Sequence, residues 1–124
     1  EYVCNGAWDI EPNDDPDTAL PMLAQDVTIY GTVDAADLDV FTFTGDGSTV
    51  DMILSMTPLT DINLGLYESP TSDFADAVLA GLSAQAGDMD ETIIAYPTTD
   101  GYTYWIAVGG VSGVSVYKLD VRFY

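Results

Sequence analysis

The stretch VYKLDVRF at residues 116–123 decides the fold class, because from residue 117 onward its apolar and polar residues alternate. Successive side chains of a β-strand point to opposite faces, so this pattern predicts a strand with one face on a core and the other in solvent. We expect the inward side chains to be Tyr117, Leu119, Val121 and Phe123, and the outward ones to be Lys118, Asp120 and Arg122.

The same period of two recurs along most of the chain. Glycine- and aspartate-rich turns separate the runs, and the sequence Gly45-Asp46-Gly47-Ser48 is typical of a hairpin turn. About seven or eight short strands with little helix predict a single all-β domain, an antiparallel β-sandwich. The expected strands are residues 27–33, 40–44, 49–56, 62–67, 91–96, 102–108 and 116–123.

Residues 68–90 are ambiguous. Phe74, Val78 and Leu82 have helical spacing, and the alanines between them favour helix. Two glycines interrupt this pattern, so we expect a long connection with one short helix.

The amino-acid composition limits the classes of function that the chain can have. The chain of 124 residues carries 21 acidic and 2 basic residues, a net charge of −19, with 48% hydrophobic residues. Such a charge excludes binding to nucleic-acid phosphates and attraction to anionic membranes. Bound calcium or high salt would mask the repulsion; a solubilising surface in a marine or halophilic protein is the alternative. The single cysteine, Cys4, allows no internal disulfide, and the missing initial methionine leads us to expect a piece cut from a larger precursor.

Catalytic arrangements are few. The chain has no histidine, so Ser-His-Asp and Cys-His sites are excluded, and we expect no enzyme. A carboxylate pair of the kind that cleaves glycosides stays open, because an acid-rich chain contains many such pairs.

An acidic segment near the N-terminus indicates a metal site. Asp9, Glu11, Asn13 and Asp14 lie within six residues, with Pro12 among them. Calcium prefers several carboxylate and amide oxygens, so we interpret this segment as part of a Ca²⁺ site; capping of turns in a charged tail is the alternative. We expect residues 1–25 to form a tether that carries this part of the site onto one module spanning residues 1–124. A second acidic loop, residues 34–39, follows the first expected strand.

Five pieces of sequence, in order, give the chain a resemblance to a known family. It resembles the bacterial pre-peptidase C-terminal domain and the related collagen-binding domain of clostridial collagenases. The pieces are Glu11-Pro12-Asn13-Asp14 with Ala19; Gly31-Thr32-Val33 before Asp37-Leu38-Asp39-Val40-Phe41; Asp61-Ile62-Asn63-Leu64 with Leu66-Tyr67; residues 101–108; and Tyr117-Lys118-Leu119-Asp120-Val121.

The resemblance implies a jelly-roll-like sandwich and a calcium site. Mapped on this chain, the family's ligands fall on two groups of residues, with the choice among Asp34, Asp37 and Asp39 left open because Val40 stands where the family often has an aromatic residue. The metal ligands expected on this basis are Asp9, Glu11, Asn13, Asp14, Asp37 and Asp39.

The function expected from the resemblance is that of a non-catalytic, calcium-binding accessory module of a secreted, extracellular bacterial hydrolase of the peptidase class. Its partner would be the preceding catalytic domain of the same precursor. One alternative is a targeting module that binds an insoluble collagen-like protein or a polysaccharide through exposed aromatics such as Tyr67, Tyr102 and Trp105, although we expect Trp105 to be buried. The other is a processing or secretion domain that is removed during maturation.

Overall fold

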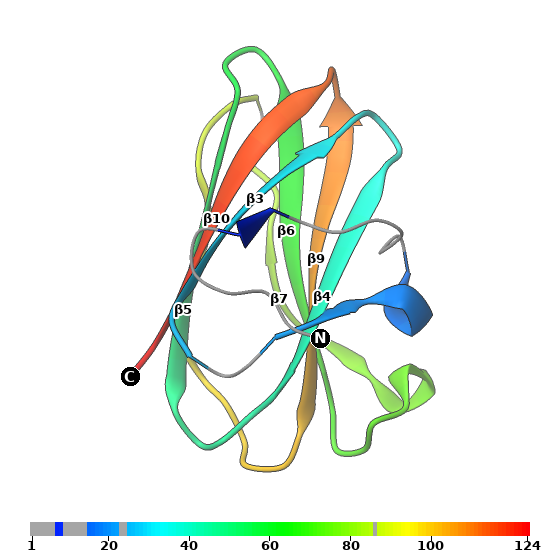
Figure 1. The fold of residues 1–124 in the computed structure, drawn as a ribbon, viewed down its shortest axis with the longest axis vertical. Coiled ribbons are helices and arrows are strands. Elements are labelled where there is room, and N and C mark those ends of the chain that lie inside the picture. The colour runs from blue at the N-terminus through cyan, green and yellow to red at the C-terminus, as the bar shows by residue number, and fades with distance from the viewer. Residues whose placement is uncertain (1–6, 9–14, 23–24, 86) are drawn as a thin grey trace.

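The chain forms two five-stranded β-sheets stacked face to face (Figure 1), and the computed structural model describes residues 7–8, 15–22, 25–85 and 87–124. The first sheet contains, in spatial order, β1 (Ala7–Trp8), β3 (Val27–Val33), β10 (Ser115–Phe123), β5 (Thr49–Met56) and β8 (Glu91–Pro97). The second contains β2 (Leu20–Pro21), β4 (Leu38–Thr44), β9 (Thr103–Ser112), β6 (Asp61–Ser69) and β7 (Val78–Ser83). Two 3-10 turns are described, η1 (Pro16–Thr18) and η2 (Phe74–Asp76).

The eight longer strands follow a jelly-roll path. From β3 to β10 the chain changes sheet at every connection except the one between β6 and β7. Neighbouring strands among these eight are antiparallel, whereas the two-residue strands β1 and β2 pair in parallel with β3 and β4. Two antiparallel sheets of four long strands each are the layout of a double-sheet jelly roll. The predicted all-β, jelly-roll-like sandwich is confirmed.

The core lies between the sheets and is centred on β10. Leu119 pairs with Ile29 on β3 and with Leu54 on β5, and none of the three is exposed. Burial of a side chain of this size stabilises the fold by about 1.5–3 kcal/mol. The alternation predicted for residues 116–123 is confirmed, since Tyr117, Leu119 and Val121 are buried and Lys118 and Arg122 are exposed.

The turn at residues 45–48 is not the hairpin that its sequence predicts. The strands on either side of it, β4 and β5, belong to different sheets, so the turn carries the chain across one end of the sandwich. The backbone N–H of Gly45 donates to the carbonyl of Tyr102 (2.8 Å), and that of Gly101 donates to the carbonyl of Gly45 (2.9 Å). A Cβ on Gly45 would lie 2.5 Å from the carbonyl oxygen of Thr99, so lack of space explains this glycine.

Residues 68–90 also differ from expectation. The helical part is only the single turn η2, and the second half of the expected connection is the edge strand β7. Pairing with β7 satisfies backbone groups along one side of β6, with a register shift between Leu66 and Tyr67. Tertiary pairing therefore overrides the local helical spacing. On β5, the outward-facing Ile53 is 38% exposed.

A buried hydrogen bond joins the two sheets. The Tyr117 hydroxyl on β10 donates to Asp39 Oδ2 on β4 at 2.7 Å, and both residues are almost completely buried. Tyr117 pairs with Gly31, near the end of β3, and Asp39 is the second residue of β4. The bond therefore lies at the end of the sandwich where β3 connects to β4.

The connection from β3 to β4 is a turn held against β9. Asp37 N–H donates to the Asp34 carbonyl (3.0 Å), while Gly110 exchanges backbone bonds with Ala36 (3.2 Å) and Asp37 (2.9 Å). A Cβ on Gly110 would lie 1.8 Å from the Asp34 carbonyl oxygen. Only glycine allows this close approach, so Gly110 sets the position of the acidic turn.

Removal of the inter-sheet hydrogen bond should destabilise the fold. Tyr117→Phe keeps the ring but leaves Asp39 Oδ2 without this donor, and we expect the free energy of unfolding to fall by about 1–3 kcal/mol. Urea unfolding with an unchanged slope measures the difference. Tyr102→Phe, which removes a hydroxyl from a half-buried ring, is the control and should cost less. Equal losses in the two variants would contradict a special role for the Tyr117 bond.

A Cβ at residue 110 should displace the acidic turn. Gly110→Ala forces the backbone at Asp34 to move, and such overpacking costs about 1–3 kcal/mol. Gly65→Ala is the matched control on β6, because its Cβ would meet only Tyr67 Cε1, at an ordinary 3.6 Å. Thermal unfolding of both variants checks this expectation, and a Gly110→Ala midpoint as high as that of Gly65→Ala would refute it.

Candidate functional site

Two of the six predicted calcium ligands lie in the described part of the chain. Asp37 is half-buried, and its Oδ1 accepts the backbone N–H of Leu38 at 2.9 Å. Asp39 follows on the inner side of β4, where its carboxylate accepts the Tyr117 hydroxyl. A carboxylate has about four lone-pair sites, so a side chain of this type can accept from several donors or bind a cation. Asp34, the first aspartate of the acidic loop, is exposed.

The other four predicted ligands, Asp9, Glu11, Asn13 and Asp14, lie outside the described residues. Within residues 7–8, 15–22, 25–85 and 87–124, no three carboxylates, histidines or cysteines gather as a metal site would require. The predicted site therefore stays a prediction.

Two short strands, β1 and β2, lie on either side of this N-terminal segment in the sequence. Before it, Ala7 and Trp8 pair in parallel with Ile29 and Tyr30 on β3. After it, β2 pairs in parallel with β4. Strand β1 therefore belongs to the first sheet and β2 to the second, and the acidic turn at residues 34–37 joins β3 and β4 of the same two sheets.

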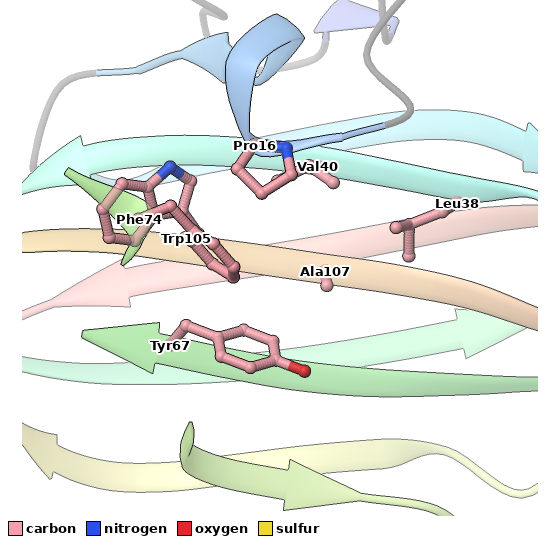
Figure 2. A pocket seen from close by; sticks show the side chains of 7 residues that line it. All are labelled: Pro16, Leu38, Val40, Tyr67, Phe74, Trp105 and Ala107. Carbon is pink, nitrogen blue, oxygen red and sulfur yellow. The ribbon is translucent and has the colours of Figure 1, made fainter. Parts of the chain in front are cut away.

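A pocket lies on the outer face of the second sheet (Figure 2). Its volume is about 230 Å³, and the labelled side chains in Figure 2 surround Ala107. Strands β4, β6 and β9 supply its floor, and the turns η1 and η2 contribute one residue each from above the sheet. The lining residues are Pro16, Leu38, Val40, Tyr67, Phe74, Trp105 and Ala107.

Three aromatic rings of this pocket pack against one another. Phe74 meets Trp105 edge to face, with ring centroids 5.0 Å apart and planes at 90°, and it meets Tyr67 at 5.4 Å and 58°. Such arrangements stabilise aromatic pairs by about 0.5–1.5 kcal/mol beyond the area they bury. The rings are therefore held as one cluster. Sequence reasoning identified Tyr67 and Trp105 on the outer face but missed Phe74, whose spacing suggested a helix.

Trp105 is buried, as predicted, with 4% of its surface exposed. Tyr67 is half-buried, and Tyr102 packs against the main core. These three aromatics thus form no flat exposed platform of the kind that stacks on a polysaccharide. Tyr67 and Trp105 line a pocket, whereas Tyr102 packs at the edge of the core.

Local capping fixes the two turns that carry Pro16 and Phe74. In η1, Asp15 Oδ1 accepts the N–H of Thr18 at 3.0 Å, and the Thr18 hydroxyl accepts the N–H of Asp15 at 3.3 Å. In η2, Asp73 Oδ1 accepts the N–H of Ala75 at 3.0 Å. Each cap satisfies backbone donors at the start of a helical turn. The sequence signals are Asp15-Pro16 and Ser72-Asp73, which are typical of turn starts.

The charge distribution separates the two faces of the sandwich. Both basic residues of the chain, Lys118 and Arg122, lie on β10 in the first sheet. They form ion pairs with Asp120, at 3.6 Å and 3.3 Å. The pocket lies on the other sheet, and acidic residues adjoin Pro16, Leu38 and Phe74 in the sequence. Neither basic residue lines the pocket, and the charged residues next to its lining residues in the sequence are all acidic.

Glu91 is a second fully buried carboxylate, and its contacts are structural. It accepts the Ser83 hydroxyl at 2.7 Å and the N–H of Gln85 at 2.9 Å. Ser83 ends β7 and Glu91 begins β8, so these bonds tie together the two edge strands. Both the Ser83 hydroxyl and the Glu91 carboxylate belong to buried residues, so this pair lies away from solvent.

Comparisons with known proteins show similarity in structure. No protein-family profile and no curated protein sequence matches the chain. The fold is similar to that of the pre-peptidase C-terminal domain of a collagenase from Bacillus anthracis, with a TM-score of 0.59 and 20% identity over 92% of this chain and 100% of that domain.

Two other bacterial proteins have similar folds. One is PliG of Aeromonas hydrophila, a periplasmic inhibitor of g-type lysozyme (TM-score 0.53, 12% identity, 99% of this chain and 98% of that one). The other is the mitogen of Yersinia pseudotuberculosis (TM-score 0.54, 15% identity, 81% and 86% covered).

In the described residues, no helix has the length and apolar character that a membrane crossing needs. The resemblance to the pre-peptidase C-terminal domain noted in the sequence is confirmed in the fold: this chain is a sandwich of that kind.

Proposed function

We propose that the chain is a non-catalytic, calcium-binding accessory module of a larger secreted bacterial hydrolase of the peptidase class. The observation that carries this proposal is the shared fold: 92% of the chain superposes on the complete pre-peptidase C-terminal domain of a collagenase. The lack of any histidine in a chain of 124 residues supports a non-catalytic role.

The oxygen-rich side chains support calcium as the metal. Ca²⁺ takes about 6–8 oxygen ligands, and Asp9, Glu11, Asn13 and Asp14 in one segment together with Asp37 and Asp39 would supply six side chains. Zinc prefers nitrogen and sulfur ligands, of which this chain offers one cysteine and no histidine. A divalent cation would also offset part of the repulsion in a chain of net charge −19.

The topology supports a site built from both segments. Strand β1 pairs with β3 and strand β2 pairs with β4, and β3 and β4 are the two strands that the acidic turn joins. A cation held between the two connections would attach the N-terminal tether to the sandwich. Because the tether would join this module to the preceding catalytic domain, calcium would also set the orientation of the module relative to that domain.

Calcium should raise the stability of the isolated chain. A ligand that binds only the folded state at about 100 times its Kd contributes about 2.7 kcal/mol, which corresponds to several degrees in the unfolding midpoint. We expect this upward shift when CaCl₂ replaces chelator in thermal unfolding. Asp14→Ala should abolish the shift, while Asp100→Ala, an exposed aspartate in the β8–β9 turn, should retain it.

Two outcomes would contradict the proposal in different ways. An identical midpoint in calcium and in chelator would remove the metal site but not the accessory role. Hydrolysis of peptide or glycoside substrates by the purified chain, lost in a carboxylate variant, would show that the module is itself an enzyme.

A further inference from the structure

We propose that the aromatic pocket on the second sheet binds a methylated ammonium group, such as the trimethylammonium head of a small molecule. Its floor is formed by residues of β4, β6 and β9, and Pro16 and Phe74 contribute from above the sheet. Its lining includes none of the proposed calcium ligands, and the proposal does not depend on the accessory function.

The aromatic cluster supplies the attraction. A cation over the face of a tryptophan, tyrosine or phenylalanine ring, within about 6 Å of its centroid, is drawn by the negative face of the ring. Tyr67, Phe74 and Trp105 are neighbours in one cluster, with centroid separations of 5.4 Å and 5.0 Å, and all three line the pocket. Because they stand at 58° and 90° to one another, a ligand in the pocket meets rings of different orientation.

The charges around the pocket favour a cation over an anion or a neutral group. Pro16 lies between Asp15 and Asp17 in the sequence, and Phe74 follows Asp73. Asp15 and Asp73 are both exposed. Both basic residues are held by Asp120 on the other sheet, so neither competes for the pocket. An apolar pocket with acidic neighbours concentrates positive ligands near its mouth.

The shortage of hydrogen-bond acceptors selects the type of cation. Among the side chains of the seven lining residues, only Tyr67 carries an oxygen, and the Trp105 indole N–H is a donor. An ammonium or guanidinium group would lose water at its N–H donors and find few partners, which costs free energy. A fully methylated ammonium has no N–H donors, and its methyl groups suit the apolar wall. The volume of about 230 Å³ is smaller than that of typical drug-sized sites, so the pocket would take a head group rather than a large molecule.

The test compares choline with its uncharged analogue, 3,3-dimethylbutan-1-ol, which has the same shape. Titration of the ¹⁵N-labelled chain, followed by the indole N–H signal of Trp105 in NMR, gives both affinities. We expect choline to bind about 5- to 30-fold more tightly, the range that a cation–π contribution implies. Added salt should weaken choline binding, because it screens the surrounding aspartates, and leave the neutral analogue unaffected.

Variants locate the site. Phe74→Leu and Tyr67→Leu keep an apolar lining but each removes one ring, and each should weaken choline binding about fivefold. Tyr67→Phe retains the ring and should bind like the parent. Tyr124→Leu removes an exposed aromatic residue outside the pocket and serves as the matched control. A dispersed NMR spectrum identifies folded variants, and if a leucine variant fails to fold, the comparison of charged and neutral ligands still decides the question.

Two results would overturn the proposal. Equal affinities for choline and its neutral analogue would show that the pocket recognises only apolar shape. Absence of any choline-dependent shift at Trp105, or an undiminished shift in Phe74→Leu, would show that the cation does not bind at these rings.

Discussion

The hydrogen bond from Tyr117 to Asp39 is the contact on which the arrangement of the two sheets most depends. Burial of a carboxylate is costly unless donors satisfy it, and this donor comes from the opposite sheet at 2.7 Å. The two strands can therefore meet in few relative positions without leaving Asp39 poorly paired. The bond lies beside the acidic turn before β4, so it also positions Asp39, one of the residues that we propose for calcium.

Strand β4 connects the two proposed sites through the alternation of its side chains. Asp39 and Phe41 face the core, whereas Leu38 and Val40 line the aromatic pocket on the outer face. The turn before this strand is held by backbone bonds to Gly110 on β9, and β9 also carries Trp105 and Ala107 into the pocket. One pair of neighbouring strands thus supports a polar site at the end of the sandwich and an apolar site on its face.

Alternation predicted the long strands because each of them has one face in the core. Alternation did not predict the edge strand β7, because that strand does not bury one continuous face in the core. The residues of β7 on the sheet edge, such as Val78 and Leu82, are exposed, so their spacing carried no signal of burial and was compatible with a helix. The hairpin predicted at Gly45 was wrong for another reason. This glycine is needed because Thr99, a residue far away in sequence, approaches it closely. Neither the edge pairing nor this approach can be read from local composition.

The sequence by itself determined the two-faced strands, the all-β class, the strongly acidic surface and the lack of histidine chemistry, because each is a property of composition or of neighbouring residues. Only the tertiary structure decided which side chains contact one another. Asp39 and Tyr117 lie 78 positions apart, and the pocket draws on residues from Pro16 to Ala107. Such groups meet only because strands distant in sequence pair within a sheet and the two sheets stack, and that pairing depends on the whole chain at once.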